Sequence, residues 1–329
     1  MVLTRAPSLF LWSATKTVDF SNCCGNGDQT STMKYASFRF VRHLATPFAT
    51  ACALGAALVC VATPVAAQDA PPPARKEFRV CQDPNNPPFS NVSGEGIENR
   101  IAEVFGKELG LPVTYYSFPQ RLAFIRNTLR YKLPGEDFRC DIVMGIPGGY
   151  DQVSVTKPYY RSTYAMVLPV KGFESVNSVA DFLKLDRAVL NKLRIGLYDR
   201  TPASDWVSKH RLVDQAVPYQ SMNADPKWYA GEIIEKELAA GKIDAAIVWG
   251  PLGGYFAKRV EQPKLKVIPM QSEPGVKFDF DMAMGVRYGE REWKQQIEAL
   301  IEAKRPEIQA ILREYGVPLV DQSGAPIPN

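Results

Sequence analysis

The chain has 329 residues, of which 46% are hydrophobic and 22% charged, and its formal net charge is +4 at pH 7. This composition suits a globular protein of one or two domains. No stripe of basic residues runs along the sequence, which argues against nucleic acid as a partner.

The N-terminal part of the sequence has the order of a secretory signal. Met33 is a second candidate start, a basic stretch follows at 34–43, and an apolar run covers 49–62. That run is shorter than the roughly 20 residues of a membrane-spanning helix. Small residues at 65–67 (Val-Ala-Ala) then offer a cleavage site. We therefore expect residues 1–67 to be an over-extended start plus a signal peptide that is cleaved after Ala67, and the mature protein to be periplasmic without a stable membrane anchor.

This cleavage would change both the charge and the cysteine content. It removes five basic and two acidic residues, which lowers the formal charge from +4 to +1. Of the six cysteines, Cys81 and Cys140 remain. Two cysteines in an exported chain are more often paired than free.

Strands and helices alternate from residue 78 onward, which indicates parallel sheets with crossover helices. Residues 278–284 then alternate apolar and polar side chains, as in a strand with one buried face. A helical stretch over 290–315, broken around Pro306, ends the pattern. The first block is predicted to contain strands at 78–81, 113–116 and 141–144 and helices at 97–109 and 119–131. The second block, about 174–268, is predicted to contain strands at 193–197 and 244–248 and helices near 178–184, from 203, and at 229–240.

The fold class is therefore predicted as α/β, with two lobes whose parallel sheets are joined by hinge strands near 163–170 and 270–284. Lobe 1 would comprise residues 76–165 with 277–318, and lobe 2 residues 166–276. Ligands of open α/β sheets bind outside the carboxyl ends of the strands. The cleft should then be lined by the loops that start at Asp83, Gly145, Tyr198 and Trp249.

Several short motifs resemble type 2 periplasmic substrate-binding proteins of the amino-acid transporter class. They occur in the family's order over nearly all of residues 76–318, and the ordered set is far more specific than any one motif. The resemblance implies the type 2 periplasmic binding protein fold. The motifs are Asp-Pro-x-x-Pro-Pro-Phe-Ser at 83–90, Gly-x-Gly-Ile-Glu at 94–98, Asp-Ile-Val-Met-Gly at 141–145, Lys-Pro-Tyr-Tyr at 157–160 and Gly-Lys-Ile-Asp-Ala-Ala at 241–246.

A narrower resemblance is to the J-type accessory proteins encoded beside PQQ-dependent methanol dehydrogenases. It implies a protein that is not an enzyme, has no cofactor of its own, and has a periplasmic quinoprotein alcohol dehydrogenase as partner. The segments that carry it are Arg-Val-Cys-x-Asp-Pro at 79–84, Pro-Gln-Arg at 119–121, Phe-Ile-Arg-Asn-Thr-Leu at 124–129, Cys-Asp-Ile-Val-Met-Gly at 140–145, Pro-Tyr-Tyr-Arg-Ser-Thr-Tyr at 158–164 and Val-Trp-Gly-Pro at 248–251.

Two alternatives stay open at this point. One is the solute-binding component of an ABC transporter for a small polar or uncharged molecule. The other is a dehydratase on the same fold, with Glu98 and Arg121 in the cleft, whose mark would be a cleft carboxylate with a raised pKa beside an open pocket. The resemblance also makes the strands of Cys81 and Cys140 neighbours in one sheet, so we expect these two cysteines to form a disulfide.

The resemblance departs from amino-acid-binding relatives at both charged anchors. Such relatives supply an Arg for the α-carboxylate and an Asp for the ammonium of the ligand. Alignment on the motifs puts Gly149 and Trp249 at those two positions, and unpaired buried charges are costly. Aromatic residues then either form a cleft for an uncharged ligand or partner, or pack together and close it. The predicted cleft residues are Asp83, Phe89, Glu98, Arg121, Tyr150, Tyr159, Thr201 and Trp249.

Catalytic and metal-binding residues are not expected. The mature chain would hold one histidine, His210, in a polar helix without a nucleophile arranged beside it. Asp279 and Asp281 point to one face of a strand, where they either bracket a hard cation or form the polar face of a hinge strand. We favour the polar face.

Overall fold

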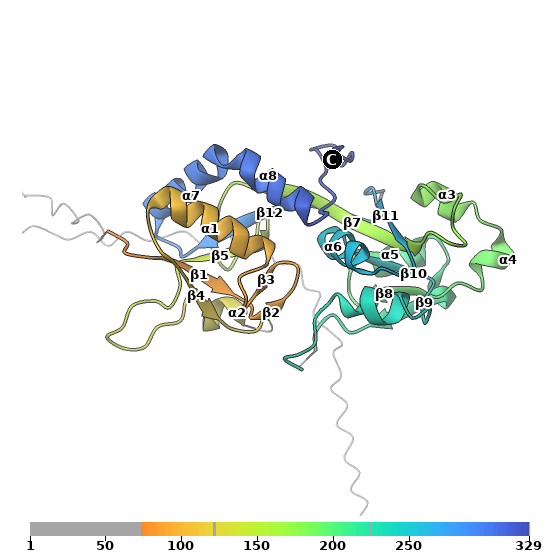
Figure 1. The fold of residues 1–329 in the computed structure, drawn as a ribbon, viewed down its shortest axis with the longest axis horizontal. Helices are drawn as coiled ribbons and strands as arrows, with labels where there is room; N and C mark the ends of the chain where they lie inside the picture. Colours follow the sequence, from red (N-terminus) through yellow and green to blue (C-terminus); the bar gives the residue numbers. More distant parts are fainter. Residues whose placement is uncertain (1–73, 121–122, 224, 329) are drawn as a thin grey trace, which may run out of the picture. The chain divides into compact units, whose positions relative to one another are not determined.

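The computed structural model describes residues 74–120, 123–223 and 225–328, and Figure 1 traces their fold. The predicted signal peptide and its cleavage after Ala67 therefore lie outside the described residues. Within those residues, no helix is long and apolar enough to cross a membrane. The chain folds into a mixed α/β structure with two lobes, as predicted from the alternation of strands and helices.

The sheet of the first lobe is mainly parallel. β1 pairs in parallel with β4 on one side and β5 on the other, and β12 runs antiparallel to β5. Helices α1, α7 and α8 cover one face, because their apolar residues share one core cluster with Phe78 and Met144. The elements are β1 (Phe78–Gln82), α1 (Ile97–Leu109), β4 (Val113–Ser117), α2 (Phe124–Asn127), β5 (Ile142–Pro147), β12 (Asp279–Val286), α7 (Arg291–Ala303) and α8 (Arg305–Glu314), with the short strands β2 (Asn85–Asn86), β3 (Ser90–Asn91) and β6 (Ser154–Val155).

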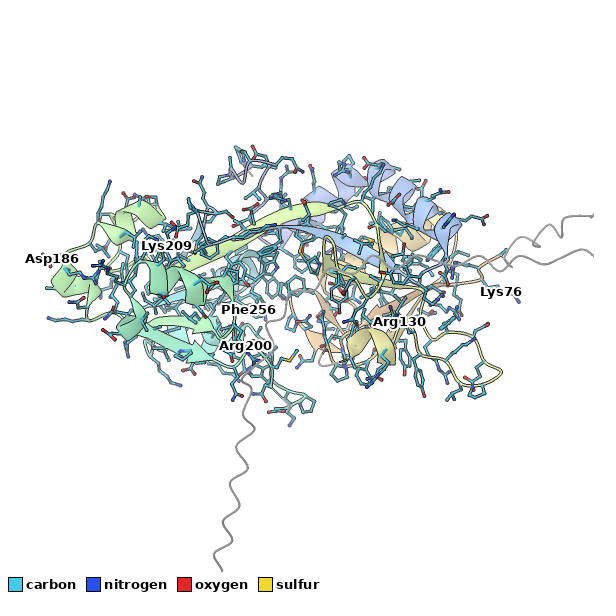
Figure 2. The ribbon with its side chains drawn as sticks, turned by 180° about the vertical axis from the view of Figure 1, so that it is seen from behind. Lys76, Arg130, Asp186, Arg200, Lys209 and Phe256 are labelled. Atoms are coloured by element: carbon cyan, nitrogen blue, oxygen red, sulfur yellow. A yellow bond between two sulfur atoms is a disulfide. The ribbon has the colours of Figure 1, made fainter. Side chains whose placement is uncertain are left out.

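The second lobe has three parallel strands, in the order β10-β8-β9. One core cluster packs α3 and α5 on one face of its sheet, and another packs α6 and a π-helix, η2, on the other. Phe256 of α6 is buried in the second cluster, whereas Arg200 and Lys209 are exposed (Figure 2). The elements are α3 (Val179–Leu183), α4 (Arg187–Leu190), β8 (Ile195–Tyr198), α5 (Pro202–Lys209), η1 (Val213–Gln215), β9 (Ala216–Tyr219), η2 (Ile233–Leu238), β10 (Ala245–Trp249), α6 (Gly250–Arg259) and β11 (Leu265–Pro269).

A single strand, β7 (Tyr160–Pro169), belongs to the sheets of both lobes. Its residues 160–163 pair with β12, its residues 164–167 pair with β10, and its residues 165–169 pair with β11. Where the pairing changes, the N–H group of Tyr164 donates to the carbonyl of Phe278 at 3.1 Å. β7 therefore carries the chain from one lobe to the other without a loop.

Two predicted helices differ from the structure. The helix predicted over 119–131 is wrong beyond the single turn of α2, and Ala123 has a φ of 66°, which an α-helix does not accommodate. The helix predicted over 229–240 is instead the π-helix η2. Its hydrogen bonds join residues five apart, as from the Ala239 N–H to the Ile234 carbonyl.

Asp141, just before β5, anchors an ion-pair network in the first lobe. Its side chain is 1% exposed and lies within 3.0 Å of the guanidinium groups of Arg75, Arg79 and Arg287. Burial alone would raise the pKa of Asp141. Hydrogen bonds from Arg79 and Arg287, with the charge of Arg75, hold that pKa below its usual value.

Candidate functional site

Cys81 and Cys140 are joined by a disulfide, with their Cα atoms 5.3 Å apart. Cys81 lies in β1 and Cys140 lies two residues ahead of β5, its neighbour in the sheet. Both cysteines belong to a small core cluster with Phe124 of α2. The bond therefore joins the two strands whose carboxyl ends lead into the predicted cleft.

Glu98 is the most unusual of the predicted cleft residues. It lies in the first turn of α1, where its N–H group donates to the carbonyl of Phe89. Among the described residues, no hydrogen bond or ion pair to its carboxylate is found. Burial, together with the negative charge of Asp83, raises the pKa of Glu98 to about 8. Arg121, predicted as its companion, lies outside the described residues.

Gly145 forms the surface on which the Glu98 carboxylate rests. A Cβ atom at Gly145 would overlap the Oε1 atom of Glu98, and the φ of Gly145 is +67°, in the left-handed region that favours glycine. The Gly145 N–H donates to the hydroxyl of Tyr159 at 3.2 Å. Tyr159 is 2% exposed. Burial is the largest cause of the raised pKa of Tyr159, and the negative charge of Glu98 raises it further. Sequence and fold thus bring Glu98, Gly145 and Tyr159 together.

Asp83 and Phe89 hold the loop beside Glu98. The Asp83 carboxylate accepts the backbone N–H groups of Asn85 and Gln120, so it ties two loops together. The side chain of Phe89 packs against a core cluster of the second lobe. Asp83 is thus held by hydrogen bonds within its own lobe, whereas Phe89 contacts the second lobe.

The other three predicted cleft residues each make contacts of their own. Tyr150 packs against the cluster around the disulfide. The Thr201 hydroxyl donates to the carbonyl of Tyr198 at 2.7 Å. The ring of Trp249 meets the rings of Tyr164 and Phe280 edge-on, at centroid distances of 5.5 and 6.0 Å. That these residues line one cleft therefore stays a prediction.

The residues considered for catalysis or metal binding have other partners. His210 lies 2.9 Å from the Glu273 carboxylate, and its ring contacts Trp206. Arg161 pairs with Asp279 and with Asp281, at 2.9 Å for the latter. Both hinge-strand carboxylates thus have a cationic partner.

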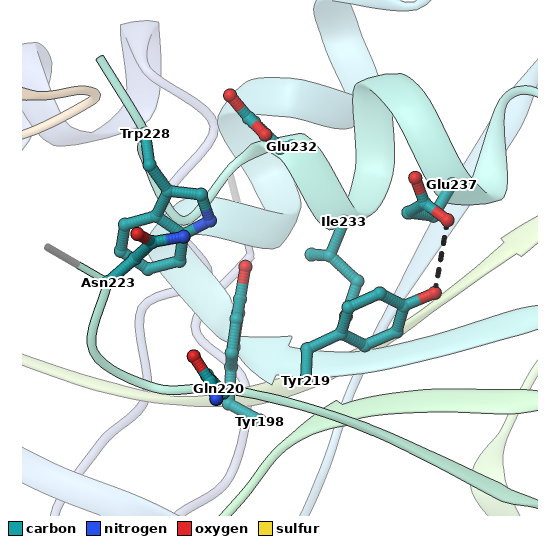
Figure 3. Close-up of a pocket in the computed structure, with 8 residues that line it drawn as sticks. All are labelled: Tyr198, Tyr219, Gln220, Asn223, Trp228, Glu232, Ile233 and Glu237. Atoms are coloured by element: carbon teal, nitrogen blue, oxygen red, sulfur yellow. Dashed lines mark hydrogen bonds between the residues drawn. The ribbon is translucent and has the colours of Figure 1, made fainter. Parts of the chain in front are cut away.

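A pocket of about 210 Å³ in the second lobe was not predicted from the sequence (Figure 3). The rings of Tyr198 and Trp228 form two of its walls, with centroids 6.2 Å apart and planes at 89°. Glu237 lies in η2 and Glu232 directly precedes it, and a spacing of five residues would put the two on different sides of an α-helix, so no sequence pattern indicated that they share a pocket. The lining residues are Tyr198, Tyr219, Gln220, Asn223, Trp228, Glu232, Ile233 and Glu237.

Comparison with known proteins gives a consistent result. No family model matches the chain. It is 31% identical to the protein MoxJ of Methylorubrum extorquens over an alignment of 298 residues that covers 84% of this chain and 93% of that protein. It is 33% identical to the crystal structure of the periplasmic binding protein XoxJ from Methylobacterium extorquens, with a TM-score of 0.59, covering 74% of this chain and all of that one.

A third match, the crystal structure of MxaJ from Methlophaga aminisulfidivorans, shares the fold at 22% identity, with a TM-score of 0.60, and covers 74% of this chain and all of that one. Sequence identity over nearly the whole of MoxJ and the fold shared with XoxJ lead to one assignment. The chain belongs to the MoxJ family of periplasmic binding proteins.

Proposed function

We propose that the protein is a periplasmic accessory protein that binds a PQQ-dependent alcohol dehydrogenase of the methanol dehydrogenase type and assists its maturation or activity. The proposal begins from the resemblance to J-type accessory proteins. The membership of the MoxJ family supports it.

The packing of Trp249 is the observation that carries the proposal. Trp249 stands where amino-acid-binding relatives are expected to supply an aspartate, and its ring contacts Tyr164 and Phe280. Gly149, at the expected arginine position, has a φ of +83° and supplies no side chain. A zwitterionic amino acid would leave both its charges without partners there, at several kcal/mol each. A fold without these solute contacts is suited to a protein partner.

We propose that the dehydrogenase docks where the two lobes meet. There the Asn85 side chain donates to the carbonyl of Pro226 at 3.0 Å. Val92, 75% exposed, follows β3 of the same hairpin, and Met222, 49% exposed, lies in the loop that contains Pro226. Exposed apolar side chains that become buried at a protein interface contribute favourably to the binding free energy.

The test is binding of purified mature protein to the purified dehydrogenase, in holo form and in metal- or cofactor-free form. We expect Val92→Asp and Met222→Asp each to weaken binding at least about tenfold, since each would bury a charge. Val189→Asp is the matched control, because Val189 is 46% exposed on α4 and should leave binding unchanged. Because the mature chain is nearly neutral, binding should survive moderate salt. Absence of binding to either form contradicts the proposal.

One observation supports the dehydratase alternative and another does not. Glu98 is a carboxylate with a raised pKa, as that alternative requires. Glu98 does not line the Tyr198–Trp228 pocket, however, and the carboxylate rests on Gly145. Turnover of a hydroxy acid substrate that Glu98→Gln abolishes would favour the enzyme. Tight binding of a small polar or uncharged solute, without turnover and without binding to either form of the dehydrogenase, would favour the transport component.

A further inference from the structure

The Tyr198–Trp228 pocket has aromatic walls on two strands and a loop. Tyr198 ends β8, Tyr219 ends β9, and Trp228 lies ahead of η2. Tyr198 is 8% exposed, and its hydroxyl donates to the carbonyl of Ala230, which fixes its ring. The perpendicular rings of Tyr198 and Trp228 form a corner in which a ligand meets two π systems (Figure 3). Such a corner attracts cations, because the face of an aromatic ring carries partial negative charge.

Two carboxylates line the same pocket. Glu237 accepts a hydrogen bond from the Tyr219 hydroxyl at 3.3 Å, and its other oxygen pairs with Lys242. Glu232 pairs through Oε1 with Lys236 at 2.7 Å. In the described part of the chain, no hydrogen bond to Oε2 of Glu232 is found. Burial is the largest cause of the raised pKa of Tyr198, and the negative charge of Glu232 raises it further. The Glu232 carboxylate therefore acts electrostatically on the Tyr198 side of the pocket.

The lysines that pair with these carboxylates do not line the pocket. Lys236 and Lys242 are 57% and 62% exposed and reach the carboxylates from solvent. Exposed pairs of this kind are weak, about 0–1 kcal/mol each. The pocket lining itself carries two negative charges and no positive one.

We propose that this pocket binds a small organic ammonium ion, free in solution, with its alkyl groups against Tyr198 and Trp228 and its charge facing Glu232. The size fits such an ion, since 210 Å³ is below the roughly 300–1,000 Å³ of sites for drug-sized ligands. An amino acid is a poor ligand, because its carboxylate would face those of Glu232 and Glu237. The inference goes beyond the proposed dehydrogenase partner and does not depend on it.

Binding should also be linked to the first lobe. The Asn85 side chain donates to the carbonyls of Pro226, at 3.0 Å, and Trp228, at 3.5 Å. Trp228 therefore forms a wall of the pocket and, through its backbone, a contact with the first lobe. An occupied pocket would hold Trp228 in place and so hold this contact.

The test is calorimetric titration of the purified mature protein with tetramethylammonium chloride, against sodium chloride at equal ionic strength. We expect saturable one-to-one binding with a Kd of about 1 mM or tighter. Neutral tert-butanol, of similar size, should bind at least about tenfold more weakly, because the attraction is to the charge. Absence of saturable heat with tetramethylammonium, or equal binding of tert-butanol, overturns the inference. Because the titration contains no dehydrogenase, its failure leaves the proposed function standing.

Two variants tie the binding to the pocket. Glu232→Gln should weaken tetramethylammonium binding at least about tenfold, and Trp228→Leu by a similar factor, whereas Trp228→Phe should retain most of it. Glu235→Gln is the matched control: Glu235 lies in η2 with 24% exposure, close to the 22% of Glu232, but pairs with Arg259 and Tyr229 outside the pocket. Circular dichroism checks that each variant is folded. Unchanged binding in folded Glu232→Gln overturns the inference.

A partner's lysine side chain carries the same chemistry as a free ammonium. Nα-acetyl-lysine amide, whose side-chain ammonium stays free, serves as the model of that side chain in the same calorimeter. Binding of this amide at least about tenfold tighter than tetramethylammonium contradicts the assignment to a free solute. Binding that is weaker or equal supports it.

Discussion

Asp141 and Glu98 are carboxylates of the same lobe whose surroundings shift their pKa values in opposite directions. Asp141 is 1% exposed and meets three guanidinium groups, and its pKa is lowered. Glu98 is partly buried beside Gly145, and its pKa rises to about 8. Loss of water disfavours charge at both sites, so the presence of cationic partners decides the outcome. The contrast separates a charged carboxylate that stabilises the fold from one that the fold keeps protonated up to about pH 8.

The largest expected effect comes from removing the charge of Asp141. Asp141→Asn leaves Arg75, Arg79 and Arg287 without their shared buried anion, so we expect a loss of about 3–5 kcal/mol in the free energy of unfolding. Urea denaturation at pH 7 measures it. The matched control is Asp244→Asn, whose pair with Arg194 is solvent-exposed and should contribute less than about 1 kcal/mol. Equal losses in the two variants would show that burial does not distinguish them.

Glu98→Gln should instead increase the free energy of unfolding at high pH. Between its usual pKa of 4.5 and its folded-state pKa of about 8, Glu98 binds a proton in the folded protein but not in the unfolded one. The native protein therefore loses stability as the pH rises through this window. Glu98→Gln removes that loss, so the variant should be more stable by about 2 kcal/mol at pH 8.5, since one pKa unit is about 1.4 kcal/mol and partial exposure weakens the effect.

The measurement is unfolding at pH 5 and at pH 8.5 for both proteins. Near pH 5 the two should be similar in stability, because Glu98 is then protonated in the folded state. Asp141 gives the reverse dependence: its lowered pKa stabilises the protein above about pH 3.8, and this contribution is lost as the pH falls further. A Glu98→Gln variant that is less stable at pH 8.5 would mean that the native carboxylate has a favourable partner.

The smallest effect is expected from Gly145→Ala. A side chain at a φ of +67° is strained, and its Cβ would displace the end of Glu98, so we expect a loss of about 1–2 kcal/mol. Part of this loss should disappear when Glu98→Ala is combined with Gly145→Ala, since only the backbone strain then remains. A double-mutant cycle by thermal unfolding measures the coupling. Strict additivity would show that Gly145 and Glu98 do not interact.

Much of the fold follows from local sequence signals. The apolar stripe over 97–109 predicts α1 with its observed bounds, and the strands predicted at 193–197 and 244–248 match β8 and β10 within two residues. The break at Pro306 separates α7 from α8, because proline is tolerated in the first turn of a helix but not in its interior. These elements are predictable because each depends on residues close in the chain.

The candidate site is harder to predict because it depends on distant residues and on backbone geometry. The partners of Asp141 come from positions 75, 79 and 287, and no spacing in the sequence links them. Glu232 and Glu237 line one pocket although a spacing of five residues would separate them on an α-helix, and no residue pattern predicted the π-helix η2. Trp249 was expected in the cleft, but whether its ring faces a ligand or packs on Tyr164 depends on both lobes.

The segment between Tyr164 and Phe278 begins and ends at hydrogen-bonded neighbours, 3.1 Å apart from nitrogen to oxygen. A stretch of chain whose two ends meet can enter or leave a host fold without moving the host's own strands. In genetic terms, the second lobe is therefore encoded by one continuous segment, a cassette, that lies within the coding sequence of the first lobe. An exchange of that cassette between homologous genes should leave the register between β7 and β12 intact, so lobes could be recombined without redesigning the junction.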